Sequence, residues 1–164
     1  DDYLREIGIR GDCVYAVYTA PLKSDIYECV DKAIYINTYL KMLNKLLSTK
    51  KYPTITVGIG IGDAIELVVK AGRKDVGINN PVWIGDAVTG ASNLSSIANK
   101  DGHGPVAFSE LAYSNTIEQL RKNNSKKDVD SWFTKYSDDK LGTYYCANIV
   151  KELFNDWIDG GMKE

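Results

Sequence analysis

The sequence predicts one domain of the mixed α/β (α+β) class, in which a mainly antiparallel sheet is flanked by helices in a ferredoxin-like arrangement. Apolar runs with period-two alternation predict pairs of strands. Runs with helical spacing separate these pairs, which is typical of a sheet covered by helices. The 164 residues suffice for a single domain with a substantial core. We therefore treat residues 1–164 as one domain.

The first expected element is a β-hairpin. Residues 7–9 and 14–18 read as strands, because apolar side chains recur at every second position of the second run. The letters RGD between them predict a tight turn, in which Gly11 supplies a permissive backbone. This arrangement places one carboxylate, Asp12, in a turn between two apolar strands.

A long helix is expected next, at 25–50, with Ser24 as its N-cap. Residues 52–72 then predict two strands joined by a glycine-rich turn. The glycine run GIGIG at 58–62 lacks the following Lys-Ser/Thr pair and does not open a helix, which argues against a nucleotide P-loop. Close packing of the strand, or a close approach of its backbone to a substrate, explains such glycines better.

The second half alternates between strands and helices. We expect Asp86 to cap one helix and Ser109 to cap the next. The expected elements are, in chain order, a loop at 73–80, a strand at 81–85, a helix at 86–99, a strand and short helix at 104–115, a polar loop at 121–130, a strand at 142–150 and a short amphipathic helix at 151–164.

Composition excludes several classes of function. The net charge of -2 argues against a broad electrostatic grip on nucleic acid. The three cysteines are far apart and form neither a metal-type spacing nor a disulfide framework, which favours a cytoplasmic protein. His103 is the only histidine, so any metal is expected to be a hard cation on carboxylate oxygens. No apolar run is long enough to cross a membrane, and no membrane partner is expected.

Three segments in this order resemble one family, the class III nucleotidyl cyclases. They are IRGDCVYAVY at 9–18, TVGIGIGDA at 56–64 and VWIGDAVTGASNLSSIA at 82–98. The first resembles the second metal-binding turn, the next the strand that follows, and the last the strand and helix that read the base and hold the transition state. The resemblance covers most of residues 4–113.

A narrower resemblance exists within this class. The segments VVKAG and GINNPVWIGDAV are similar to the pyrimidine nucleotide cyclases of bacterial anti-phage defence, known as the Pycsar system. The resemblance implies conversion of a pyrimidine nucleoside triphosphate, UTP before CTP, into its 3′,5′-cyclic monophosphate and pyrophosphate. It also implies that the product switches on a separate effector.

The resemblance implies two divalent cations, Mg²⁺ or Mn²⁺, which two aspartates usually bridge. Asp12 matches one of these metal ligands. The other is expected upstream of Asp1, on a first strand that this sequence is expected to lack. Class III sites form between two subunits, so the resemblance further implies a homodimer with its sites at the subunit interface.

The positions that read the base in purine cyclases correspond here to Gly8 and Val82. Neither residue can direct a side-chain hydrogen bond at adenine or guanine, which favours a different base or a different reader. Asn79 and Asn80 are alternative sources of polar groups. Trp83 is also placed with the substrate-binding positions, although the tryptophans as a group are better expected in the core or at a dimer interface than as stacking platforms.

The helix after the IGDAV letters usually presents an asparagine and, one turn later, an arginine. Here these catalytic positions hold Thr89 and Asn93. Thr89 can still hydrogen-bond the ribose, but Asn93 brings no positive charge to the developing phosphate charge. We therefore expect Lys140 to supply the charge, with Arg73 and Lys74 as alternatives.

Two other functions compete with this one. The missing first aspartate and the Thr89/Asn93 pair are also compatible with a degenerate cyclase-like module that dimerises or senses nucleotide without catalysis. A diguanylate-cyclase-like domain is a third possibility, against which the absence of a GGDEF-type turn argues.

Overall fold

The computed structural model describes residues 3–72 and 79–163, and these form a mixed α/β fold, as expected. Its centre is a four-stranded sheet in the order β3 (Ile59–Ile61), β6 (Val106–Ser109), β8 (Gly142–Ala147) and β7 (Phe133–Asp138). Only the pair β3–β6 of this sheet is parallel, and the other neighbours are antiparallel. The expected mainly antiparallel sheet is therefore confirmed.

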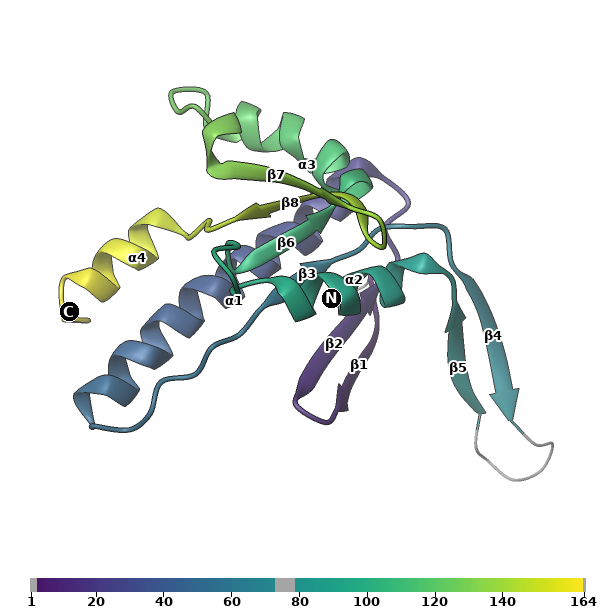
Figure 1. Ribbon diagram of the computed structural model, residues 1–164, viewed down its shortest axis with the longest axis horizontal. Helices are drawn as coiled ribbons and strands as arrows, with labels where there is room; N and C mark the ends of the chain where they lie inside the picture. Colours follow the sequence, from purple (N-terminus) through teal and green to yellow (C-terminus); the bar gives the residue numbers. More distant parts are fainter. Residues whose placement is uncertain (1–2, 73–78, 164) are drawn as a thin grey trace.

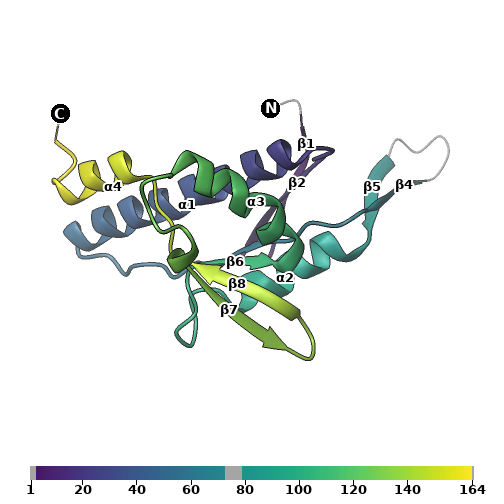
Figure 2. The same ribbon diagram turned by 90° about the horizontal axis from the view of Figure 1, so that it is seen from above.

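Helices cover both faces of this sheet (Figures 1 and 2). On one face, Val106 and Phe108 of β6 pack with α1 (Lys23–Thr49) and α3 (Glu110–Asn123). On the other face, Ala107 packs with α2 (Asp86–Ile97). Successive side chains of a strand point to opposite faces of the sheet. The consecutive residues Val106, Ala107 and Phe108 are therefore buried on two different faces. The last helix, α4 (Glu152–Asp159), lies beside α1.

Two β-hairpins project away from the central sheet (Figure 1). The first pairs β1 (Leu4–Arg10) with β2 (Cys13–Tyr18), and its turn places Gly11 at a φ of 64°. A positive φ is a conformation that glycine adopts without strain, so the expected RGD turn is confirmed. The second pairs β4 (Leu67–Gly72) with β5 (Asn79–Ile84).

The glycine run packs against the backbone of α2. A Cβ added at Gly60 would lie 2.0 Å from the carbonyl oxygen of Ala91, and one added at Gly62 would lie 2.3 Å from that of Ala87. Close strand packing is therefore the reason for these glycines. The prediction that they form a turn between two strands was wrong, because Gly60 lies within β3 and residues 62–66 make the connection to β4.

Two of the three predicted helix caps were wrong. The long helix begins at Lys23 rather than after Ser24, and the carboxylate of Asp25 accepts a hydrogen bond from the N–H of Leu22 at 2.9 Å. A carboxylate in the first turn can reach back in this way. The N-cap of α2 is Gly85 rather than Asp86. Ser109 caps α3 as predicted, accepting from the N–H of Ala112 at 3.1 Å.

The strand β7 was missed by the sequence analysis, and so was the short 3₁₀ helix Asp130–Trp132 before it. Thr134 and Lys135 are exposed on this edge strand, which hides the apolar alternation. Helix α3 also continues to Asn123, into the predicted polar loop. The strand at 142–150 and the closing helix are confirmed, in shorter form, as β8 and α4.

Of the loop predicted at 73–80, residues 73–78 lie outside the described residues, and Asn79 and Asn80 begin β5. Within the described ranges, no helix is both long and apolar enough to span a bilayer.

Candidate functional site

Asp12 lies at the tip of the hairpin β1–β2 and is exposed. An exposed carboxylate suits a hard cation that keeps several water ligands and takes only one or two carboxylates from the protein. In residues 3–72 and 79–163, no group of three or more His, Cys, Asp or Glu side chains could hold a metal ion. Asp12 therefore fits as one ligand of a metal site, and the described part of the chain does not complete that site.

Tyr15 fills the space beside Gly8, the first predicted base-binding position. The two residues face each other across the hairpin. A Cβ added at Gly8 would lie 2.3 Å from Cζ of Tyr15 and 2.4 Å from its hydroxyl oxygen. The position that lacks a polar side chain of its own is therefore covered by a polar group from the neighbouring strand.

Glu6 joins this hairpin to the second one. Its Oε1 accepts a hydrogen bond from the Tyr15 hydroxyl at 2.6 Å, and its Oε2 accepts one from the indole N–H of Trp83 at 2.6 Å. The bond from Tyr15, and to a lesser degree the bond from Trp83, hold the pKa of Glu6 below its usual value. The bond between Tyr15 and Glu6 also raises the pKa of Tyr15. The structure thus brings Trp83 next to the hairpin of Gly8.

Sequence analysis missed Glu6 and Tyr15. One signal for Glu6 was available: a charged residue at an alternating position of a strand, two residues before Gly8, shares a face with it. The contact with Trp83 left no such signal, because the two residues lie 77 positions apart.

Val82 does not join the cluster of Glu6, Tyr15 and Trp83. It precedes Trp83 in β5 and therefore lies on the opposite face of that strand, paired with Val69. Its side chain is 41% exposed. The alternative charge donors Arg73 and Lys74 lie outside the described residues, so the structure does not place them.

Thr89 and Asn93 lie one turn apart on α2 and therefore share one side of that helix. The start of α2 is fixed by Glu66, whose Oε1 accepts a hydrogen bond from the N–H of Ala87 at 2.5 Å. Gly85 leaves room for this carboxylate, because a Cβ there would lie 2.6 Å from it. Glu66 thereby sets the position of the helix that carries Thr89 and Asn93.

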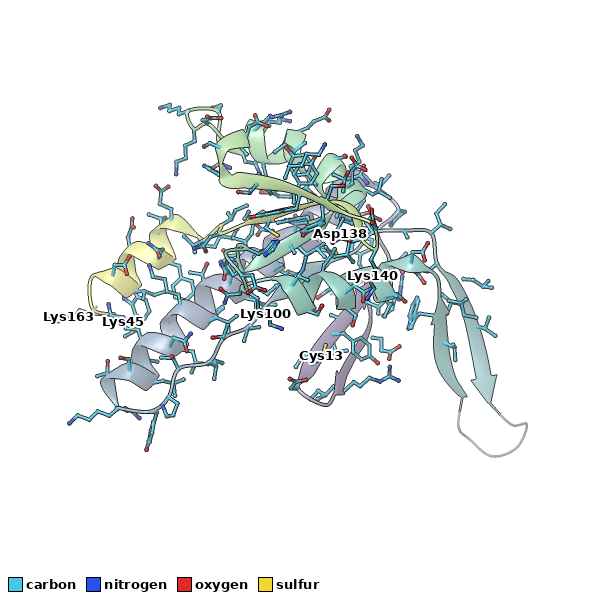
Figure 3. The ribbon with its side chains drawn as sticks, viewed as in Figure 1. Cys13, Lys45, Lys100, Asp138, Lys140 and Lys163 are labelled. Atoms are coloured by element: carbon cyan, nitrogen blue, oxygen red, sulfur yellow. The ribbon has the colours of Figure 1, made fainter. Side chains whose placement is uncertain are left out.

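Lys140 lies in the turn between β7 and β8 and is exposed. Oδ1 of Asp138 closes this turn by accepting hydrogen bonds from the N–H groups of Lys140 and Leu141, at 2.8 and 2.7 Å. Leu141 packs into the cluster that contains Leu94 of α2. The turn of Lys140 is therefore held at α2 (Figure 3), whereas Asp12 lies on the separate hairpin β1–β2.

Two curated proteins match the chain. Over 161 residues it is 53% identical to a protein from Treponema porcinum that is named uridylate cyclase. The matched region covers 98% of this chain and 54% of that protein. The chain is similar to a uridylate cyclase over nearly its whole length. A second protein of that name, from Gulbenkiania mobilis, is 26% identical over 162 residues, covering 94% of this chain and 62% of the relative.

The chain thus spans between half and two thirds of the length of these curated relatives. No family model matches it. No solved structure matches it significantly.

Proposed function

We propose that this chain is the catalytic part of a class III pyrimidine nucleotide cyclase, which converts UTP into 3′,5′-cyclic UMP and pyrophosphate. The observation that carries the proposal is the similarity to a uridylate cyclase across 98% of the chain. CTP is the second candidate substrate. The geometry supports the proposal, because Thr89, Asn93 and Lys140 belong to elements that pack together.

In this reaction the ribose 3′-oxygen attacks the α-phosphorus. The bond between these atoms forms, the bond from the α-phosphorus to pyrophosphate breaks, and the hydroxyl proton passes to solvent. Two divalent cations, Mg²⁺ or Mn²⁺, polarise the phosphates and lower the pKa of the attacking hydroxyl when they are bound. Asp12 offers a carboxylate ligand. Thr89 hydrogen-bonds the ribose, and the ammonium group of Lys140 stabilises the charge that develops on the phosphate oxygens.

We propose a homodimer in which Asp12 of one protomer works with Thr89 and Asn93 of its partner. An apolar face on the hairpin β1–β2 supports this arrangement. Ile7, Ile9 and Val14 are 61%, 77% and 70% exposed, and the pairing of Ile9 with Val14 puts them on one face. Contiguous exposed apolar side chains of this kind mark interaction surfaces. This face lies beside the turn of Asp12.

The product is proposed to act as a second messenger on a separate effector in the cytoplasm, in anti-phage defence. This role follows from the resemblance to the Pycsar cyclases. Because the resemblance implies a toxic effector, it predicts that a culture carrying the protein and its effector resists phage infection better than a culture carrying the Asp12→Ala variant.

A nucleotide-sensing module without catalysis is the second candidate. Asn93 in place of a cationic residue favours it, as does the incomplete set of carboxylates around Asp12 in the described residues. The two candidates are separated by incubating the purified full-length protein with each of the four nucleoside triphosphates and Mn²⁺. Cyclic UMP and pyrophosphate from UTP support the cyclase. Tight binding of UTP without either product supports the sensing module.

A further inference from the structure

The cluster of Glu6, Tyr15 and Trp83 is the one place where polar side chains from the two hairpins meet at a predicted base-binding position among the described residues. Glu6 lies two residues before Gly8 on the same face of β1. The ring of Tyr15 covers Gly8 from the facing strand. Trp83 reaches the same carboxylate from β5. All three side chains are only partly buried, so a ligand can reach them.

The three side chains of this cluster offer an approaching ligand acceptors and no free donor, and Arg10, on the same face of β1, is close enough to Tyr15 to oppose the rise of its pKa. The hydroxyl proton of Tyr15 and the indole proton of Trp83 are both committed to Glu6. A carboxylate has about four lone-pair directions, of which these bonds use two. The lowered pKa of Glu6 keeps it ionised at neutral pH, so it carries no proton of its own to donate. The hydrogen of any further bond to the Glu6 carboxylate must therefore come from the ligand.

We infer that Glu6 selects uracil over cytosine in the proposed site by accepting the hydrogen bond of the uracil N3–H group. The inference rests on the proposed function. Uracil carries a hydrogen on N3, whereas N3 of cytosine carries a lone pair that faces the carboxylate without a hydrogen between them. A hydrogen bond to an ionised acceptor is about twice as strong as a neutral one. A site that bonds its substrate in this way rejects an analogue lacking the hydrogen strongly.

Tyr15 and Trp83 position this acceptor. Without them the Glu6 side chain would be free to turn between rotamers, so the two bonds aim its lone pairs. A purely structural role for Glu6, as a link between the two hairpins, predicts a different result. Loss of a link weakens the use of every nucleotide alike, whereas loss of a base reader changes the ratio between nucleotides.

The test measures kcat and KM of the full-length protein for UTP, CTP and N3-methyl-UTP, in which a methyl group replaces the N3 hydrogen. For the wild type we expect kcat/KM for UTP to exceed that for the other two nucleotides by about 100-fold. In Glu6→Gln, an amide N–H replaces one acceptor. We expect the KM for UTP to rise at least about tenfold and the preference for UTP over CTP to shrink to less than about tenfold.

Glu28→Gln is the matched control, because Glu28 is an exposed glutamate of α1. This control variant should leave both the UTP to CTP ratio of kcat/KM and the KM for UTP unchanged. Equal use of UTP and N3-methyl-UTP by the wild type would overturn the inference, as would an unchanged UTP to CTP ratio in a folded Glu6→Gln. If Glu6→Gln does not fold, the N3-methyl-UTP comparison in the wild type decides alone. A wild type that forms no cyclic UMP overturns the proposed function itself, whereas cyclic UMP formation with an unchanged ratio overturns only the role of Glu6.

Discussion

The proposed chemistry depends most on a single residue, the exposed carboxylate of Asp12 in the turn of the first hairpin. Replacing it by alanine should reduce Mn²⁺-dependent turnover of UTP at least about 100-fold, because the proposed metal ligand is lost. The melting temperature should stay within about 2 °C of the wild-type value, since surface substitutions rarely change stability. Asp156→Ala, at an exposed carboxylate of α4, is the control for a general effect of charge. A folded Asp12→Ala that keeps most of its activity would contradict the assignment.

The three cysteines should react with thiol reagents in the order of their exposure. Cys13 is exposed and Cys29 partly buried, whereas Cys146 is buried between the sheet and α2. Burial raises the pKa of Cys146 to about 11. At pH 8 only about one thiol in a thousand is then the reactive thiolate. Mass spectrometry should find Cys13 modified first and Cys146 modified only when the protein is unfolded. Equal labelling of Cys146 and Cys13 in the folded protein would show that α2 does not cover the sheet as described.

At the scale of the elements, the contact between β3 and α2 depends on glycine. The Cβ of Gly60→Ala would lie 2.0 Å from the backbone oxygen of Ala91, so the helix must move away from the strand. We expect the free energy of unfolding to fall by about 3 kcal/mol or more. Gly90 lies on α2, and an added Cβ there has nothing within 4 Å. Gly90→Ala should therefore raise the free energy of unfolding by about 0.5–1 kcal/mol. Urea denaturation of both variants provides the measurement, and equal stability of the two would refute this packing.

The elements also show how far local sequence rules reach. Ser109 could be predicted as a cap because its partner, Ala112, is three residues away. Glu66 could not, since it caps a helix that begins 20 residues later and its carboxylate reaches that helix only in the folded chain. The strand β7 was hidden because an edge strand exposes polar residues that resemble a loop. Period-two alternation, by contrast, predicted the hairpin β1–β2 correctly.

Motifs that are continuous in the sequence predict Asp12, Thr89 and Asn93 as site residues. The structure places them in a turn and on one side of a helix, and their roles stay predictions. The cluster around Glu6 depends on a tertiary contact between two hairpins and was therefore missed.

At the scale of the whole molecule, the proposed homodimer combines Asp12 of one protomer with Thr89 and Asn93 of its partner. This arrangement makes a mixing experiment decisive. Asp12→Ala and the double variant Thr89→Ala/Asn93→Ala should each be inactive alone. After mixing and subunit exchange, half of the dimers hold one intact site, so about a quarter of wild-type turnover should return. Return of no activity, with exchange verified by mass spectrometry, would contradict shared sites.

The central claim, a cyclase that prefers uridine nucleotides, is tested most directly by one competition measurement. The purified full-length protein is incubated with UTP, CTP, ATP and GTP at equal concentrations and Mn²⁺, and the cyclic nucleotides formed are quantified by mass spectrometry. Cyclic UMP should be the main product and cyclic CMP a minor one, because the proposed base reader Glu6, held by Tyr15 and Trp83, would accept the N3–H of uracil. Mainly cyclic AMP or cyclic GMP, or no cyclic nucleotide at all, would contradict the claim.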